Sequence, residues 1–140
     1  MEVREGMSSV VLTVGPGHTL REAARRMTEK SVGAAVVIDE ELPGPGVVSE
    51  RDILNSLGNG QDPDIELVSD HMTDTVISAE PEWSLERAAV EMSRRHIRHL
   101  VVVEHGELVG VLSMRDIVRC WTTEGATAST TSPEAEQSPV

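Results

Sequence analysis

The sequence has no phenylalanine and no tyrosine, and Cys120 is its only cysteine. No disulfide can therefore form within the chain, and no cysteine-rich metal site is expected. Positive charge is scarce as well, because 12 Lys and Arg stand against 24 Asp and Glu, a formal net charge of −12. Phosphate backbones and anionic lipids are bound by clustered positive charge, so we expect neither nucleic acid nor membrane as a partner. With no signal-peptide pattern and no apolar run near the roughly 20 residues that span a bilayer, the sequence predicts a cytoplasmic protein.

The sequence also lacks the common catalytic motifs. It contains no nucleophile elbow, no Walker-type phosphate loop and no zinc-hydrolase motif, so we expect a protein that is not an enzyme. His96 and His99 lie close together but have no cysteine or carboxylate ligand beside them, which predicts no metal site. Cys120 falls in the predicted last helix with no reactive signature around it, and we interpret it as a buried, inert thiol.

An internal repeat is the strongest pattern in the chain. A shift of 65 residues, reduced to 64 after one loop, aligns sixteen identical pairs in order over about fifty positions. That order, with a single gap, favours duplication over chance. The pairs are Val3/Val68, Met7/Met72, Val11/Val76, Pro16/Pro81, Leu20/Leu85, Ala23/Ala88, Ala24/Ala89, Met27/Met92, Val36/Val101, Val37/Val102, Gly46/Gly110, Val47/Val111, Ser49/Ser113, Arg51/Arg115, Asp52/Asp116 and Ile53/Ile117.

Each copy shows the same order of predicted elements, so the sequence predicts an α/β fold of two tandem β-α-β-β-α units. Thr19 is a good N-cap, Glu22 completes a capping box, and Ser84 is the counterpart of Thr19. Apolar residues at i, i+3, i+4 and i+7 then predict helices that bury one face. Valine-rich runs predict strands. The predicted strands are Val10–Val14, Ala35–Ile38, Gly46–Val48, Val76–Ala79, Leu100–Glu104 and Val109–Leu112, and the closing helices are Glu50–Leu57 and Arg115–Trp121.

The repeat divides the chain into four segments. We place the first unit at residues 1–57, a polar linker at 58–66 and the second unit at 67–121. Residues 122–140 are rich in Thr, Ser, Glu, Ala and Pro and have almost no large apolar side chains. Such a segment buries too little surface to offset its ordering entropy, so we expect a disordered tail.

Each unit ends in the same short motif, and this motif carries a family resemblance. The segments 46–52 (GVVSERD) and 110–116 (GVLSMRD) resemble the CBS-domain signature: glycine, two strand residues, Ser or Thr, two variable residues and Asp. The segments 3–8 and 68–73 are similar to the usual start of a CBS motif. Over residues 3–121 the chain thus resembles a CBS-domain pair, a tandem of cystathionine-beta-synthase-type domains, of the stand-alone bacterial type.

The resemblance implies a pseudo-twofold pair with its sheets packed together and two clefts between the repeats. Members of the family commonly bind AMP, ADP, ATP or S-adenosylmethionine in those clefts, and pairs often stack into a disc-shaped homodimer. It therefore implies a regulatory module that senses an adenine nucleotide and signals to an effector protein whose identity the sequence does not give. By the same resemblance, residues near Thr13–Val14 and Ser78–Ala79 would approach the adenine.

The Ser-x-x-Asp part of the motif can bind a nucleotide for a simple physical reason. Ser49 lies where a strand ends and a helix begins, and the unpaired N–H groups there form a ready anion site. Ser49 could donate to a phosphate, and the resemblance gives Asp52 the role of holding the ribose hydroxyls. Ser113 and Asp116 repeat the arrangement. The alternative is that both motifs are capping boxes that stabilise their helices with no ligand.

Arg51 and Arg115 stand in the first turn of their helices, where a cation opposes the helix dipole. A bound phosphate would explain both placements, and an exposed ion pair with a nearby carboxylate is the alternative. The resemblance adds Arg98 and His99 as phosphate contacts. The first copy has the uncharged segment 31–34 at the position of 96–99, so we predict two unlike sites.

The neighbouring pair Arg94 and Arg95 has a plainer explanation, since positive charge suits the end of a helix. We interpret both as a solvated helix end and not as ligands.

Three functions remain open. The first is a nucleotide-sensing module, the second a structural or dimerisation module with no nucleotide ligand, and the third an undetected enzyme. A ligand-dependent rise in stability separates the first from the second. Turnover of a nucleotide with Mg²⁺, abolished by Asp116→Ala, would be needed to support the third.

Overall fold

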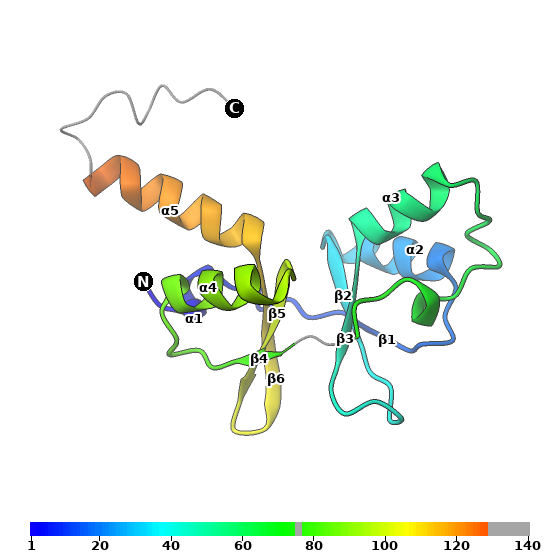
Figure 1. Cartoon of the computed structure of the whole chain (residues 1–140), viewed down its shortest axis with the longest axis horizontal. Coiled ribbons are helices and arrows are strands. Elements are labelled where there is room, and N and C mark those ends of the chain that lie inside the picture. The colour runs from blue at the N-terminus through cyan, green and yellow to red at the C-terminus, as the bar shows by residue number, and fades with distance from the viewer. Residues whose placement is uncertain (75–76, 129–140) are drawn as a thin grey trace.

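The computed structural model describes residues 1–74 and 77–128, and it consists of two similar halves that lie side by side (Figure 1). Each half has one three-stranded sheet and two main helices. The first half contains β1 (Thr13–Val14), α2 (Leu20–Lys30), β2 (Ala34–Val37), β3 (Gly46–Ser49) and α3 (Glu50–Gly58). The second contains β4 (Ser78–Ala79), α4 (Leu85–Arg95), β5 (His99–Glu104), β6 (Glu107–Ser113) and α5 (Met114–Ala128). The predicted α/β fold of two tandem units is confirmed.

The two sheets pair in the same way. In the first, β1 runs parallel to β2, and β2 is antiparallel to β3. In the second, β4 runs parallel to β5, and β5 is antiparallel to β6. Even the register is repeated, since Thr13 lies opposite Val36 as Ser78 lies opposite Val101. Residues that match in the sequence repeat therefore occupy matching places in the fold.

The helices α2 and α4, which match in the repeat, begin and end in the same way. The Thr19 side chain accepts a hydrogen bond from the Glu22 N–H at the start of α2, and Ser84 accepts from the Arg87 N–H at the start of α4. The predicted capping box at Thr19 is only half formed, because the Glu22 carboxylate lies 3.5 Å from His18 Nε2 instead of returning to the cap. Each of these two helices then stops at a residue in the left-handed region.

Several predicted boundaries move. The strand predicted at Val10–Val14 is reduced to Thr13–Val14, the two residues that pair with Val36 and Val37 of β2. The strand predicted at Val76–Ala79 contains Ser78–Ala79, and Val76 lies outside the described residues.

The last helix extends to Ala128, past the end predicted at Trp121. Thr122 continues the helix and its hydroxyl donates to the Val118 carbonyl at 2.7 Å. The remainder of the predicted tail, 129–140, lies outside the described residues.

The segments that precede the two halves are exchanged between them. The short helix α1 (Val3–Gly6) packs on the second half, where Val3 is buried in the core. The 3₁₀ turn η1 (Val68–Asp70) packs on the first half, where Val68 is buried. Backbone hydrogen bonds fix both, from Val3 N to the Trp83 carbonyl at 2.7 Å and from Val68 N to the His18 carbonyl at 2.8 Å.

This exchange explains why Gly46 and Gly110 carry no side chain. A Cβ at Gly110 would lie 2.5 Å from Met7 Sδ and 2.9 Å from the Ser8 carbonyl oxygen. A Cβ at Gly46 would lie 2.9 Å from the Thr73 carbonyl oxygen. The exchanged segments run directly over these two strand residues, so each crossing ties one half to the other.

The two sheets meet through valine side chains. Val36, Val47 and Val101 are fully or almost fully buried and form a cluster that joins the halves. Partly buried residues extend this cluster towards the cleft described below, among them Ala34 and Val111.

No helix in the described part of the chain is long and apolar enough to cross a membrane.

Candidate functional site in the cleft between the halves

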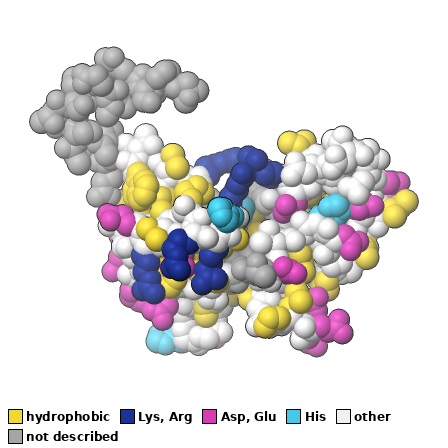
Figure 2. Space-filling view, in the orientation of Figure 1, with side chains coloured by type: hydrophobic (Ala, Val, Ile, Leu, Met, Phe, Trp, Pro, Cys, Tyr) yellow, Lys and Arg dark blue, Asp and Glu magenta, His cyan; other side chains and the backbone are white. Residues whose placement is uncertain are grey.

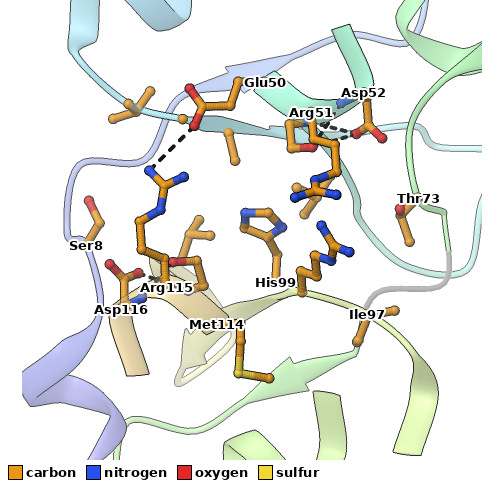
Figure 3. A pocket seen from close by; sticks show the side chains of 18 of the residues that line it. Ser8, Glu50, Arg51, Asp52, Thr73, Ile97, His99, Met114, Arg115 and Asp116 are labelled. Carbon is orange, nitrogen blue, oxygen red and sulfur yellow. Dashed lines mark hydrogen bonds and ion pairs between the residues drawn. The ribbon is translucent and has the colours of Figure 1, made fainter. Parts of the chain in front are cut away.

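A cleft of about 900 Å³ lies between the two halves (Figure 3). Both Ser-x-x-Asp motifs open into it, because β3 and β6 end at its wall and α3 and α5 begin there. The eight residues that the sequence predicts as binding residues all line this cleft. They are Ser49, Arg51, Asp52, Arg98, His99, Ser113, Arg115 and Asp116.

Both motifs form complete capping boxes. Ser49 N–H donates to Asp52 Oδ2 at 2.8 Å, and Asp52 N–H donates to Ser49 Oγ at 3.3 Å. The bonds between Ser113 and Asp116 are 2.9 and 3.0 Å in the same two directions. Both motifs therefore cap their helices, as the alternative expected, and each aspartate uses Oδ2 to accept the capping hydrogen bond. What distinguishes the two aspartates is their other oxygen.

Oδ1 of Asp116 accepts a hydrogen bond from Arg119 Nη1 at 3.1 Å. Within residues 1–74 and 77–128, no hydrogen bond reaches Oδ1 of Asp52. Arg119 was not predicted from the sequence; it also donates to the Gly6 carbonyl of α1 at 3.4 Å. Its signal in the sequence is faint, because the matching residue of the first copy is the neutral Asn55.

The cleft is the place where this acidic chain gathers positive charge. Its wall has four arginines and three carboxylates, a local charge of +1 on a chain of −12. Figure 2 shows basic side chains in the notch between the halves. The charged lining residues are Glu50, Arg51, Asp52, Arg98, Arg115, Asp116 and Arg119.

Arg51 and Arg115 match in the repeat but have different surroundings. Arg115 Nη1 lies 3.6 Å from Glu50 Oε1 of the other half, and both side chains are mostly exposed, at 83% and 61%. This contact is the exposed ion pair that the sequence left as an alternative. Arg51 reaches into the cavity towards His99 (Figure 3), and no ion pair to Arg51 is found among the described residues.

His99 lies at the centre of the cleft, between the two motifs (Figure 3). Burial lowers the pKa of its imidazole, and the nearby charges of Asp52, Asp116 and Glu50 oppose that shift while Arg98 adds to it. Asp52 has the largest effect of these charges on the His99 pKa. His99 therefore favours the neutral form, and its ring lies between the two motifs.

The two copies contribute different residues to the cleft wall. At the position of Arg98 and His99 the first copy has Gly33 and Ala34, which also line the cleft. A Cβ at Gly33 would lie 3.2 Å from Glu50 Oε1, so the Glu50 carboxylate lies over this uncharged segment. Glu50 was missed from the sequence. Its signal was the mismatch with Met114, its counterpart in the second copy.

The residues suggested for adenine are not part of the cleft wall. Val14 and Ala79 are buried in the cores, and Thr13 and Ser78 are exposed. Ser78 lines a separate, smaller cavity of about 180 Å³. In each of these two-residue strands one side chain points into the core and the other is exposed to solvent.

The structure also shows where the remaining charged and metal-ligating residues discussed above lie. Arg94 and Arg95 lie outside the cleft and pair with Glu91 at 3.1 and 3.2 Å, as a solvated helix end would. Cys120 is buried, as predicted. His96 lines the cleft with His99. In the part of the chain that the structure describes, no group of three or more His, Cys, Asp or Glu residues could hold a metal ion.

Comparison with known proteins gives a consistent picture. The family model described as CBS domain matches the chain twice, at residues 2–59 and 68–122. The CBS domain-containing protein YhcV of Bacillus subtilis (strain 168) is 34% identical over 116 residues, which are 82% of this chain and 81% of YhcV. Two further curated relatives are longer, and the matched region is 57% and 41% of their length.

Solved structures share the fold. The CBS domain protein PAE2072 from Pyrobaculum aerophilum, complexed with AMP, has a TM-score of 0.71 and 35% identity, covering 91% of this chain and 99% of that one. The CBS domain pair of protein MJ0100, in complex with 5′-methylthioadenosine and S-adenosyl-L-methionine, has a TM-score of 0.70. It is 23% identical and covers 86% of this chain and 99% of that one, a likeness that shows the fold alone.

Proposed function

The chain belongs to the CBS-domain family as a tandem pair, and from this premise we propose that it is a regulatory module that binds an adenine nucleotide in its central cleft. One observation carries the proposal. A chain with a net charge of −12 lines a single cleft with four arginines, and two of them, Arg51 and Arg98, have no ion-pair partner among the described residues. Unpaired cations around a cavity of nucleotide size favour an anionic ligand.

The contacts can be assigned by chemistry. An aspartate beside a helix N-terminus can accept hydrogen bonds from two neighbouring ribose hydroxyls. Asp52 is suited to this role, because its Oδ1 accepts no hydrogen bond from the part of the chain that the structure describes. Guanidinium groups bind phosphate oxygens in pairs, a role for Arg51 and Arg98. His99 can donate its imidazole N–H to a phosphate. The helix N-termini of α3 and α5 add a favourable dipole.

The relative that is most informative about the ligand is PAE2072, whose structure contains AMP. At 35% identity over nearly the whole of that chain, its ligand makes AMP the first candidate for this chain. ADP, ATP and S-adenosylmethionine remain further candidates.

The regulatory step follows from the position of the cleft. A ligand that contacts both halves stabilises the arrangement in which its contacts are best, by the difference in its affinity for the alternatives. A partner protein that recognises this arrangement would read the signal. The proposed role is that of a sensor and not of a catalyst.

We further propose a homodimer, built on α3 and α5. These helices begin at the cleft and rise on the same side of the two sheets (Figure 1). Each exposes two large apolar side chains at positions that match in the repeat: Leu54 at 68% and Leu57 at 48% on α3, Val118 at 53% and Trp121 at 44% on α5. Duplicated exposed apolar residues are typical of an interaction surface.

The alternative function is a structural module with no nucleotide ligand. The capping boxes favour it, because Ser49/Asp52 and Ser113/Asp116 already satisfy each other without a ligand. That alternative accounts for Arg115 and Arg119, which pair with Glu50 and Asp116, but gives no role to Arg51 and Arg98. The two functions make opposite predictions for ligand binding.

The test is thermal melting with AMP, ADP, ATP, S-adenosylmethionine and, as a control, GMP. A ligand at 100 times its Kd stabilises the fold by about 2.7 kcal/mol, a shift that is easily measured. We expect such a shift for an adenosine ligand and its loss in the double variant Asp52→Asn/Asp116→Asn. Asparagine retains a side-chain oxygen for the cap, so the apo protein should still fold.

Glu86→Gln is the matched control, because Glu86 is an exposed carboxylate in the first turn of α4, away from the cleft. This variant should keep the ligand shift. No shift with any adenosine compound would favour the structural module. A shift that survives in the double variant would contradict the role given to Asp52 and Asp116.

A further inference from the structure

The cleft has two sides that differ in charge. Figure 3 shows Arg51, Asp52 and Thr73 on one side, which we name the Asp52 side. Ser8, Glu50, Arg115 and Asp116 lie on the other, which we name the Asp116 side, and His99 stands between them. The two sides are related by the sequence repeat, so any difference between them comes from particular substitutions.

The decisive substitution is at the first residue of each closing helix. In α3 this residue is Glu50, and in α5 it is Met114. Glu50 crosses to the Asp116 side and pairs with Arg115 at 3.6 Å. Met114, the counterpart of Glu50 in the repeat, is uncharged and can offer Arg51 no such ion pair. Arg115 therefore has an ion pair with the other half, whereas no ion pair to Arg51 is found within residues 1–74 and 77–128.

A second substitution acts in the same direction. Gly33 lies beside Glu50, whose N–H donates to the Gly33 carbonyl at 2.9 Å. Its counterpart Arg98 stands in the same relation to Met114, whose N–H donates to the Arg98 carbonyl at 2.9 Å. The segment beside Glu50 is thus uncharged, whereas the segment beside Met114 carries a guanidinium.

The charges of the two sides follow from these positions. On the Asp116 side the two carboxylates Glu50 and Asp116 pair with Arg115 and Arg119, so both of these arginines already have a partner. Among the described residues, the unpaired arginines of the cleft are Arg51 and Arg98. A phosphate on the Asp116 side would have to displace Glu50 from Arg115 or remain next to its negative charge.

We propose that Glu50 is the specificity-determining residue of the cleft. It reserves the Asp52 side for the phosphate-bearing nucleotide and leaves the Asp116 side to an adenosine compound without a phosphate. This inference rests on the proposed function and adds to it a ligand class for each side and a stoichiometry of one phosphorylated nucleotide per chain.

The exposure of the Glu50–Arg115 pair fits this role. Exposed ion pairs contribute little to stability, so Glu50 is not needed to hold the halves together. Its effect on a ligand is different, because its carboxylate opposes a second negative charge that enters the cleft. Neutralising Glu50 should therefore change ligand selection and leave the fold unchanged.

The experiment is isothermal titration calorimetry of the wild-type chain and Glu50→Gln with AMP and with adenosine. The wild type should bind one AMP per chain, lost in Asp52→Asn and retained in Asp116→Asn. Glu50→Gln should bind a second AMP, or bind AMP on the Asp116 side about tenfold more tightly, a change of one order of magnitude in Kd. Adenosine binding should be the same in both proteins, and Glu86→Gln should behave as wild type.

Two outcomes would overturn the inference in different ways. Two equal AMP sites in the wild type, or identical AMP titrations of wild type and Glu50→Gln, would show that Glu50 does not select the ligand, although nucleotide binding itself would stand. If neither AMP nor adenosine produced heat with any of the proteins, the proposed nucleotide-binding function would fail and the role of Glu50 with it.

Discussion

His99 connects the electrostatics of the cleft to the stability of the fold. Its imidazole is partly buried between the two halves, and burial lowers its pKa below the ordinary value of about 6.5. The carboxylates of Asp52, Asp116 and Glu50 face the ring and oppose the shift, and Arg98 reinforces it. The net effect is a histidine that the folded protein prefers to keep neutral.

This preference predicts a loss of stability in acid. Where the folded pKa lies below the unfolded one, the unfolded chain binds more protons, so stability is complete above about pH 6.5 and falls as the pH is lowered through the folded pKa. His99→Gln removes the titrating group. The drop in melting temperature between about pH 7.5 and pH 5 should therefore be smaller in His99→Gln than in wild type.

The matched control for this comparison is His105→Gln, because His105 is exposed in the turn between β5 and β6. It should lose as much stability in acid as the wild type does. Equal drops in wild type and His99→Gln would contradict the assignment of the acid sensitivity to His99.

The residue-scale prediction from sequence was good where a motif defined the backbone. Ser49, Asp52, Ser113 and Asp116 follow strands and start helices, so their place at the cleft could be inferred from the motif. The role of Glu50 in the cleft could not be inferred from the sequence. A glutamate in the first turn of a helix is common, because its charge is favourable with the helix dipole. Only the packing of the two halves brings Glu50 to Arg115.

At the scale of the elements, the exchange of α1 and η1 is the feature that ties the halves together. Val3 is fully buried in the second half, although it lies at the start of the first repeat. The internal repeat pairs Val3 with Val68, but it does not indicate that each valine is buried in the core of the opposite half. The hydrophobic pattern of a repeat reports that a residue is buried and not which copy buries it.

We predict that Val3→Ala destabilises the whole chain. Full burial of a valine side chain contributes about 1.5–3 kcal/mol, and alanine keeps only part of it, so a loss of about 1–2 kcal/mol in the free energy of unfolding is expected. Chemical denaturation with fluorescence of Trp83 would report it, because Trp83 packs against the second-half core and its carbonyl binds the Val3 N–H.

The control for Val3→Ala is Val90→Ala on α4, where the valine is mostly exposed. Surface substitutions of this kind change stability by about 0.5 kcal/mol or less. A Val3→Ala variant as stable as Val90→Ala would mean that α1 does not dock on the second half in solution.

The boundaries of the elements show what local sequence can predict. The starts of α2, α4 and α3 agree with the prediction because Thr19, Ser84 and Ser49 are caps with a clear chemical signature. The end of α5 does not agree, since residues 122–128 have no proline and their Thr and Ala residues permit helix as well as coil. A composition that permits two states does not choose between them.

At the scale of the whole molecule, the distribution of surface residues separates two functions. Four arginines line the cleft, and the exposed faces of α3 and α5 carry large apolar side chains. These two surfaces begin at the same helix N-termini, so a ligand that moves the N-termini of α3 and α5 would also move the surface through which we propose that two copies associate. Ligand binding and association are therefore expected to be coupled.

The last prediction tests the proposed dimer. Trp121→Glu and Leu57→Glu place a charge at matching positions of α5 and α3, both of which are exposed in the monomer, so each variant should fold. A buried charge without a partner is costly in an interface, and tryptophan is a frequent hot spot that costs about 2 kcal/mol or more when lost. Each variant should therefore shift the measured mass from twice 15.2 kDa to the monomer value in light scattering. Val90→Glu changes an equally exposed valine on α4 and should leave the dimer intact. A wild type that remains monomeric at every concentration, or a dimer that survives both variants, would contradict an interface formed by α3 and α5.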